Sequence, residues 1–197
     1  LPKWRGAAPI QRSLMNLDKS TGISVMKIVP KLDSGPIMMV KKIDIVEGSN
    51  FLDLSKQLSE LGAKTILECL DLIEKKQDNF IPQNDLEASY AKKINKVESK
   101  INWNKKAKAI IAKINALNPN PGAWFEINDK RIKPIKAKEI QMSGKPGTIL
   151  KENFTIGCLD KAVQILELQK EGKKPMTSEE YLRGNTLKVG SKIKFDA

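Results

Sequence analysis

Apolar and polar residues in the first 45 positions predict a short helix followed by two strands. Pro9 fits the first turn of a helix over 7–16, where the N–H that proline lacks would have no helical partner. The segment 23–29 is rich in β-branched residues and ends at Pro30, as a strand would. The segment 37–45 is apolar first and alternating later, which indicates a second strand.

The next pattern, over residues 50–76, predicts two helices. Asn50 can cap the first helix, with Asp53 three residues later, and Gly62 interrupts the pattern. The second helix runs over 63–76. The expected apolar faces are Leu54, Leu58 and Leu61 in the first helix, and Ile66, Leu67, Leu70 and Ile73 in the second. Two strands followed by helices do not close a core, so we expect the final part of a larger α/β sheet.

Periodicity is weak over 80–100, which predicts a linker. Asn104 can cap a helix that runs to about residue 117, where an Asn-Pro-Asn-Pro-Gly run over 118–122 ends it. Thr177 and Glu180 form a capping box for a short helix before Gly184.

The remainder of the chain has the spacing of a small β domain. A hairpin turn is expected over 128–130, and a last strand is expected through Val189 and Ile193. The other expected strands are 123–127, 131–140, 147–150, 154–159 and 163–169. This spacing of short strands, led by one helix, favours an OB-like β-barrel, although a fold alone does not establish function.

Composition excludes several kinds of site. The chain has 0 His, so it cannot by itself build a Ser-His-Asp triad, a Cys-His dyad or a His-liganded metal site. Cys69 and Cys158 are too few and too distant for a disulfide framework or a zinc site, and we expect reduced thiols and no bound metal. No apolar run approaches the roughly 20 residues of a membrane helix, so no membrane partner is expected.

Charge is distributed unevenly between the two halves. Residues 1–90 hold 12 Lys and Arg and 12 Asp and Glu, so the whole formal net charge of +12 lies in 91–197. This asymmetry favours an anionic partner for the second half, most simply a nucleic acid. The alternative is a lysine-rich genome, but such a bias should act on both halves. Trp103 and Trp124 could stack on bases, although their apolar neighbours favour core packing for each.

Several segments together resemble the methionyl-tRNA formyltransferase family over nearly the whole chain. The first of them is the most specific, and an Asn-Pro-x-Pro-Gly turn alone would be a weak signal. The segments are 1–12 (LPKWRGAAPIQR), 18–26 (DKSTGISVM), 32–36 (LDSGP), 118–124 (NPNPGAW), 146–149 (PGTI) and 172–176 (GKKPM).

The resemblance implies an α/β-plus-β architecture. The C-terminal remnant of a Rossmann-like formyltransferase domain would cover 1–79, a linker 80–100, and an OB-like tRNA-binding domain 101–197. The chain starts at Leu1, just after the position of the family's catalytic Asn-x-His motif. We therefore expect a C-terminal fragment, somewhat under two-thirds of the enzyme and inactive alone.

The resemblance also implies roles for individual residues. Asp33 corresponds to the carboxylate that orients the family's catalytic His, although an Asp in Leu-Asp-Ser-Gly could simply form a turn. The loop Leu1, Pro2, Lys3 and Trp4 would line the site of the 10-formyltetrahydrofolate co-substrate. Arg5 would meet the substrate or support the site through an ion pair, and Gly6 would permit an unusual backbone angle. The expected tRNA-phosphate contacts are Lys92, Lys93, Lys96, Lys105, Lys106, Lys108, Lys173 and Lys174.

The expected function is formyl transfer from 10-formyltetrahydrofolate to initiator methionyl-tRNA, by an enzyme that is a monomer when intact. It would act in the bacterial cytoplasm, or in an organelle in a eukaryote. One alternative is a folate-dependent formyltransferase that acts on a sugar nucleotide. A second is a non-catalytic RNA-binding fragment, and a generic OB-type protein is a third, which leaves residues 1–45 unexplained.

Overall fold

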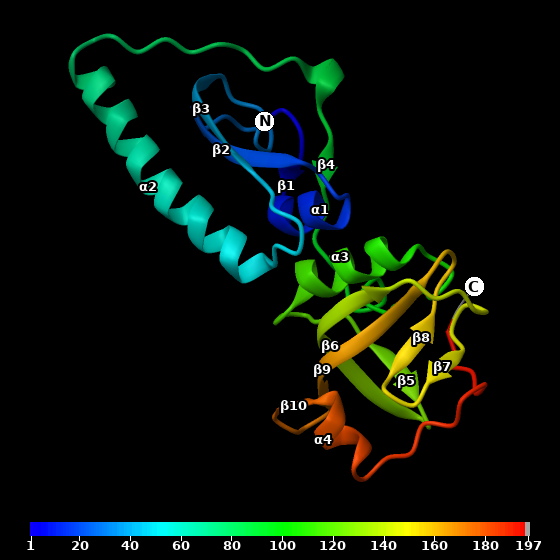
Figure 1. Cartoon of the computed structure of the whole chain (residues 1–197). Helices are drawn as coiled ribbons and strands as arrows, with labels where there is room; N and C mark the ends of the chain where they lie inside the picture. The colour runs from blue at the N-terminus through cyan, green and yellow to red at the C-terminus, as the bar shows by residue number, and fades with distance from the viewer. Residues whose placement is uncertain (196–197) are drawn as a thin grey trace. The chain divides into compact units, whose positions relative to one another are not determined.

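The computed structural model describes residues 1–195, which fall into two compact units (Figure 1). The first unit comprises Leu1–Lys93, and the second begins at Ile94. The elements of the first unit are β1 (Arg5–Gly6), α1 (Pro9–Met15), β2 (Ser20–Met26), β3 (Ile37–Asp44), α2 (Phe51–Glu74), a 3-10 helix η1 (Asp85–Glu87) and β4 (Tyr90–Ala91).

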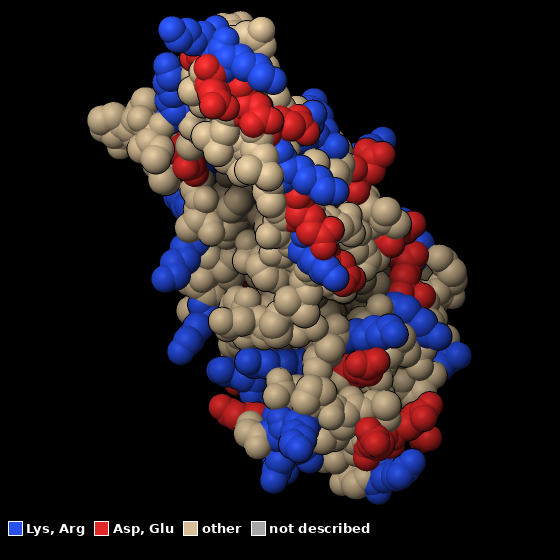
Figure 2. All heavy atoms as spheres, turned by 90° about the vertical axis from the view of Figure 1, so that its left-hand side faces the viewer, with Lys and Arg blue, Asp and Glu red and all other residues tan. Residues whose placement is uncertain are grey.

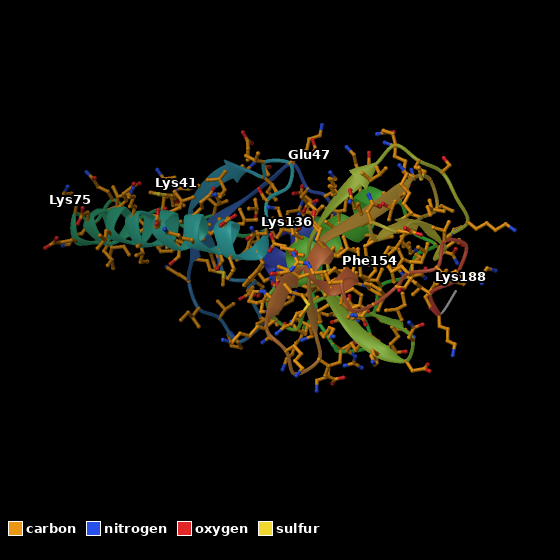
Figure 3. The ribbon with its side chains drawn as sticks, turned by 60° about the horizontal axis from the view of Figure 1, so that its bottom comes forward. Lys41, Glu47, Lys75, Lys136, Phe154 and Lys188 are labelled. Carbon is orange, nitrogen blue, oxygen red and sulfur yellow. The ribbon has the colours of Figure 1, made fainter. Side chains whose placement is uncertain are left out.

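Strands β2 and β3 form an antiparallel pair with two different faces. Paired residues share a face, so Ile23 and Lys41 point to one side, while Ser24 and Val40 point to the other. Helix α2 covers the first side: Lys41 forms an ion pair with Glu68 of α2 at 2.9 Å, and Figure 3 shows Lys41 beside that helix. The second side is left to line a cleft.

Helix α2 is continuous, so the expected break at Gly62 is wrong. Its start is confirmed, because Asn50 Oδ1 accepts a hydrogen bond from the Asp53 N–H at 3.0 Å. An interior glycine costs a helix about 1 kcal/mol relative to alanine. Packing on both sides of Gly62 outweighs this cost, since Leu54 and Leu58 before it and Cys69 after it are buried.

The expected apolar face of the second half of α2 is also wrong. Ile66, Leu67, Leu70 and Ile73 are 43%, 62%, 52% and 44% exposed, whereas Thr65 and Cys69 are buried. Figure 2 views the molecule from the side of α2, where charged side chains of both signs alternate with uncharged surface. Helix α2 is therefore apolar on two sides, and within the described residues only one of them is covered.

The segment expected to be a linker is divided between the two units. Strand β4 pairs in parallel with β1, with Arg5 opposite Tyr90 and Gly6 opposite Ala91. An isolated bridge joins Ile37 to Ile81. The part up to Lys93 is therefore held within the first unit by backbone hydrogen bonds, and the remainder belongs to the second.

The second unit is built on a six-stranded antiparallel sheet in the order β5-β6-β9-β8-β7, with β10 also paired to β9. Helix α3 packs against β6 and β9. The elements are α3 (Ala107–Leu117), β5 (Phe125–Ile127), β6 (Lys130–Ile140), β7 (Ile149–Lys151), β8 (Thr155–Gly157), β9 (Ala162–Lys170), β10 (Pro175–Thr177) and α4 (Ser178–Leu182).

A chain of four aromatic side chains runs through the core of this unit. The ring centroids of Trp103 and Phe125 are 5.4 Å apart, those of Phe125 and Phe154 are 6.1 Å apart, and those of Phe154 and Tyr181 are 5.4 Å apart. Figure 3 shows Phe154 among the strands of this unit. The first two pairs meet edge to face, a favoured aromatic arrangement. The prediction that Trp103 packs in the core is confirmed.

Two local features that the sequence predicts, a hairpin turn and a helix cap, are present in the second unit. Asn128 and Asp129 both have positive φ angles, of 51° and 57°, as a two-residue hairpin turn requires. The capping box of Thr177 and Glu180 is present at the start of α4. Both predictions are confirmed because they depend on neighbouring residues alone.

Two expectations for this unit are wrong. Helix α3 begins at Ala107 and not beside Asn104, because Asp160 Oδ1 accepts the Ala107 N–H at 2.9 Å. The region of Val189 and Ile193 forms isolated bridges in place of a regular strand within the described residues. Strand β10 was not anticipated, because its short sequence precedes the capping box directly.

Asp160 should therefore stabilise the second unit as a remote cap. Hydrogen bonds from the Ala107 and Lys161 backbone N–H groups keep the pKa of Asp160 below its ordinary value, although burial opposes this. Asp160→Ala should lower the free energy of unfolding by about 1 kcal/mol at neutral pH, and Asp160→Asn should lower it less.

Because the pKa of Asp160 is depressed in the folded state, its contribution is present above its unfolded pKa and is lost as the pH falls through the folded value. Urea unfolding at neutral and acidic pH measures this, with the exposed Glu152→Ala as control. Equal stability of wild type and Asp160→Ala at neutral pH would contradict the assignment.

Candidate active site

An open cleft of about 740 Å³ lies in the first unit. The opening loop Leu1–Trp4 forms one wall, and the face of the β2–β3 pair that α2 leaves free forms another, with Ser24, Val40 and Lys42. Asp33 also lines the cleft. The structure therefore brings together the expected folate loop and the expected catalytic carboxylate.

The opening loop has an unusual backbone that later residues hold in place. Trp4 has a φ of 63°, in the left-handed backbone region that residues other than glycine rarely adopt. Its backbone N–H donates to Ser89 Oγ at 3.0 Å, and the Arg5 N–H donates to the Ser89 carbonyl at 2.8 Å. The loop is thus shaped by a segment some 85 residues further along the chain.

Arg5 is a fully buried side chain with exposed fraction 0%. Its Nε and Nη2 donate to Gln83 Oε1 at 3.1 and 2.8 Å, and its Nη1 donates to Asp85 Oδ1 at 2.8 Å. Hydrogen bonds from Lys31 and then from Arg5 hold the pKa of Asp85 below its ordinary value. This geometry places Arg5 as a support of the loop and gives it no exposed surface for a substrate.

The carboxylate of Asp33 is tied to the same loop. Its Oδ2 accepts the Gly6 N–H at 2.7 Å. Gln83 Nε2 donates to the Asp33 carbonyl at 2.9 Å and to the Gly35 carbonyl at 2.8 Å, which fixes the turn. Gln83 lies in a stretch without periodicity and contacts residues far away in the chain, so nothing local in the sequence marks it as a site residue.

Two glycines permit this close packing. Gly6 has a φ of 122°, and a Cβ there would lie 2.9 Å from the Ala91 carbonyl oxygen. A Cβ on Gly35 would collide with the Lys27 carbonyl oxygen. Both positions therefore exclude every other residue type without a shift of the backbone.

Asp18 lines the cleft and was given no role by sequence analysis. Its carboxylate accepts three hydrogen bonds: from Lys3 Nζ at 2.9 Å, Trp4 Nε1 at 2.7 Å and Asn16 Nδ2 at 2.6 Å. Burial raises the pKa of Asp18, but these donors outweigh burial and hold that pKa below its ordinary value. The signal in the sequence was its place in the DKSTGISVM segment.

The expected tRNA-binding lysines are all exposed but lie in different places. Lys92 and Lys93 end the first unit, and Lys96 belongs to the second. Lys105, Lys106 and Lys108 gather at the start of α3, while Lys173 and Lys174 lie in the turn between β9 and β10.

Trp124 is half-buried, and two cationic side chains lie over its ring. The Arg131 guanidinium lies 4.0 Å from the ring centroid and Lys100 Nζ lies 5.6 Å from it. Trp124 Nε1 donates to the Lys96 carbonyl at 3.2 Å. Arg131 thus joins the basic residues near Lys96, a contact that spacing along the chain did not indicate.

Two family models match this chain. The formyl transferase model matches residues 1–70, and the formyl transferase C-terminal domain model matches residues 93–186. The chain belongs to the formyl transferase family. The match over residues 1–70 contains all the cleft-lining residues except Glu87, and the match over residues 93–186 contains most of the second unit.

A relative from Pelagibacter ubique, named methionyl-tRNA formyltransferase, is 45% identical over 98% of this chain and 63% of its own length. The chain thus spans somewhat under two thirds of this relative. The structure of HypX from Aquifex aeolicus in complex with tetrahydrofolic acid matches 92% of this chain and 33% of its own, with a TM-score of 0.70 and 19% identity.

The N-formyltransferase from Helicobacter canadensis, in complex with folinic acid and dTDP-3-aminofucose, matches 86% of this chain and 63% of its own. Its TM-score is 0.70 and its identity 22%. These likenesses confirm the formyltransferase fold. Among residues 1–195, no group of three or more Cys, Asp or Glu side chains is arranged to hold a metal ion. No helix in that range is long and apolar enough to cross a membrane.

Gly6→Ala should disrupt the site by separating β1 from β4. The added Cβ would press on the Ala91 carbonyl at an unfavourable φ, so the first unit should lose roughly 1–3 kcal/mol of unfolding free energy. Hydrogen exchange of the β2 and β3 amides under urea measures this loss. Gly62→Ala is the matched control, because its Cβ would make only ordinary contacts with Ile23 and should stabilise α2. Unchanged exchange in Gly6→Ala would contradict the role of this contact.

Proposed function

We propose that this chain is the larger part of a methionyl-tRNA formyltransferase. The reaction would transfer a formyl group from 10-formyltetrahydrofolate to the α-amine of initiator methionyl-tRNA. The observation that carries the proposal is the Asp33 carboxylate, fixed by the Gly6 N–H at 2.7 Å beside a cleft walled by Leu1–Trp4. The 45% identity to the Pelagibacter ubique relative supports the choice of substrate.

The cleft suits a folate as co-substrate. Its volume of about 740 Å³ falls within the range of small-molecule sites. Apolar side chains such as Leu1, Pro2 and Val40 offer contact area for a ring system, while Ser24 and Lys42 offer polar groups. The HypX structure was solved with tetrahydrofolic acid, which supports a folate in this fold.

The chemistry requires a neutral amine, stabilisation of a tetrahedral oxyanion and a proton for the departing folate nitrogen. The chain contains 0 His, so the Asn and His that the resemblance implies would come from a part of the enzyme outside these 197 residues. Asp33 would orient that His and raise its pKa by favouring the cation. The Gly6 N–H would hold the Asp33 carboxylate in one direction, and Arg5 would hold the loop that carries Gly6.

The second unit, together with Lys92 and Lys93 directly before it, would bind tRNA. We propose that its curved antiparallel sheet is an OB-like barrel and that the first unit is the remnant of a Rossmann-like domain. The formal net charge of +12 lies within 91–197, which favours a phosphate backbone as partner. The intact enzyme would be a monomer in the bacterial cytoplasm, where translation begins.

A sugar-nucleotide formyltransferase is the second candidate. The Helicobacter canadensis enzyme shares the fold with a TM-score of 0.70, but its identity of 22% is about half that of the Pelagibacter ubique relative. A sugar nucleotide also gives no reason for a basic second half. Parallel assays with methionyl-tRNA and with dTDP-3-aminofucose distinguish the two candidates when this chain is completed by the preceding region of the Pelagibacter ubique relative.

Asp33→Asn should slow formyl transfer strongly and leave tRNA affinity unchanged. The assay uses a chimera in which this chain replaces the matching region of the Pelagibacter ubique relative. The substitution keeps the size and the hydrogen bond to Gly6 but removes the charge, so single-turnover rates should fall by about 100-fold or more. Asp78→Asn, at an exposed position after α2, is the control. A rate near wild type would make Asp33 a turn residue only.

Removing three basic side chains should weaken tRNA binding without changing selectivity. If about four to six lysines neutralise phosphates, log affinity should fall with log salt with a slope of roughly −3 to −5. Replacing Lys92, Lys93 and Lys96 together by Ala should flatten this slope by about two units. A salt titration of the 197-residue chain with initiator and elongator tRNA measures the slope.

The matched control for this triple variant removes the same charge from the neutral half of the chain. Lys56 and Lys64 are exposed on α2, and Lys75 is exposed directly after it. Replacement of all three by Ala should leave the slope unchanged. Equal effects of the two triple variants would show that net charge alone matters. An affinity independent of salt would show that the lysines are only a solvated surface.

A further inference from the structure

The wall of the cleft depends on a tryptophan in an unfavourable backbone conformation. Trp4 has a φ of 63°, which a bulky residue adopts only when its surroundings hold it there. The hydrogen bond from its backbone N–H to Ser89 Oγ fixes the peptide group but does not set the direction of the indole. A further contact must hold the side chain against the cleft.

Asp18 provides that contact. Its Oδ2 accepts the indole N–H of Trp4 at 2.7 Å, and its Oδ1 accepts Lys3 Nζ at 2.9 Å. Lys3 Nζ also lies 5.4 Å from the centroid of the Trp4 ring. One carboxylate thus engages two consecutive side chains of the wall, one through each oxygen.

Hydrogen bonds fix both the backbone and the side chain of Asp18. It follows the end of α1, and its backbone N–H donates to the carbonyl of the buried Ser13 at 3.0 Å. Asn16 Nδ2 donates to Oδ1 at 2.6 Å, and only 10% of the Asp18 side chain is exposed. A carboxylate with three donors and a fixed backbone can act as a template for a mobile partner.

We propose that Asp18 is the positioning residue of the folate site, which clamps Trp4 and Lys3 so that the wall of the cleft is formed before the co-substrate binds. This inference rests on the proposed function for its ligand. The clamp should affect folate affinity and not the chemical step, because the hydrogen bonds of Asp18 go to Lys3, Trp4, Asn16 and Ser13 and not to Asp33 or Gly6. Tetrahydrofolate would lose affinity when the wall is no longer held in its binding shape.

The clamp itself is tested in the 197-residue chain by NMR of the three tryptophan indole N–H groups. Trp4→Phe assigns the Trp4 signal. Asp18→Asn and Asp18→Ala should both shift that signal, with the larger change in Asp18→Ala, and should leave the signals of Trp103 and Trp124 in the second unit unchanged. A Trp4 signal that does not move in either variant would overturn the clamp, whatever the enzyme does. Movement of all three signals would indicate general unfolding and would also count against it.

The role in binding is tested by kinetics in the Pelagibacter ubique chimera. Asp18→Ala should raise KM for 10-formyltetrahydrofolate about tenfold, with kcat and KM for methionyl-tRNA within about threefold of wild type. Asp18→Asn should recover part of the loss, because its amide oxygen can still accept the indole N–H. Asp78→Ala, an exposed position outside the cleft, should have no effect.

These outcomes separate the two proposals. An unchanged folate KM in Asp18→Ala, or equal losses in kcat and in both KM values, would overturn the positioning role. A wild-type chimera that transfers no formyl group would overturn the proposed function, while the indole signals would still decide whether Asp18 holds Trp4.

Discussion

The side-chain amide of Gln83 connects the parts of the first unit that form the cleft. Its oxygen accepts two hydrogen bonds from the buried Arg5 guanidinium, and its nitrogen donates to the carbonyls of Asp33 and Gly35. Both ends of the amide are therefore engaged, so its orientation is fixed. The opening loop, the Asp33 turn and the segment before β4 are held together by this one group. A change in any of these three segments would alter the position of the Asp33 carboxylate.

This arrangement explains why a buried arginine is tolerated beside a candidate catalytic centre. An isolated buried charge is costly, but Arg5 meets Gln83 on one edge and Asp85 on the other. Asp85 remains 59% exposed and also pairs with Lys31. The positive charge of Arg5 is thus compensated at the surface by Asp85, while the other guanidinium donors hold Gln83 behind the opening loop.

Features of this fold that depend on neighbouring residues can be predicted from the sequence, whereas features that depend on distant residues cannot. The Asn50 cap, the turn at Asn128 and Asp129, and the α4 capping box are local, and all are present. The start of α3 was misplaced because its cap, Asp160, is 53 residues away. The family resemblance identified Asp33 and the opening loop as candidates, but Gln83 and Asp18 act through contacts that only folding creates.

The capping of α3 by Asp160 has a consequence for the order of folding. An isolated helix of this length is marginal in water, and its first turn is the costly step. Here that turn is completed by a side chain that arrives only when the loop between β8 and β9 closes against it. The hydrogen bond between Ala107 and Asp160 closes a loop of 53 residues. The entropic cost of closing this loop is not offset by local contacts. The N-terminal turn of α3 should consequently become ordered together with the sheet, as one cooperative event, and not as an early helix onto which the strands later assemble.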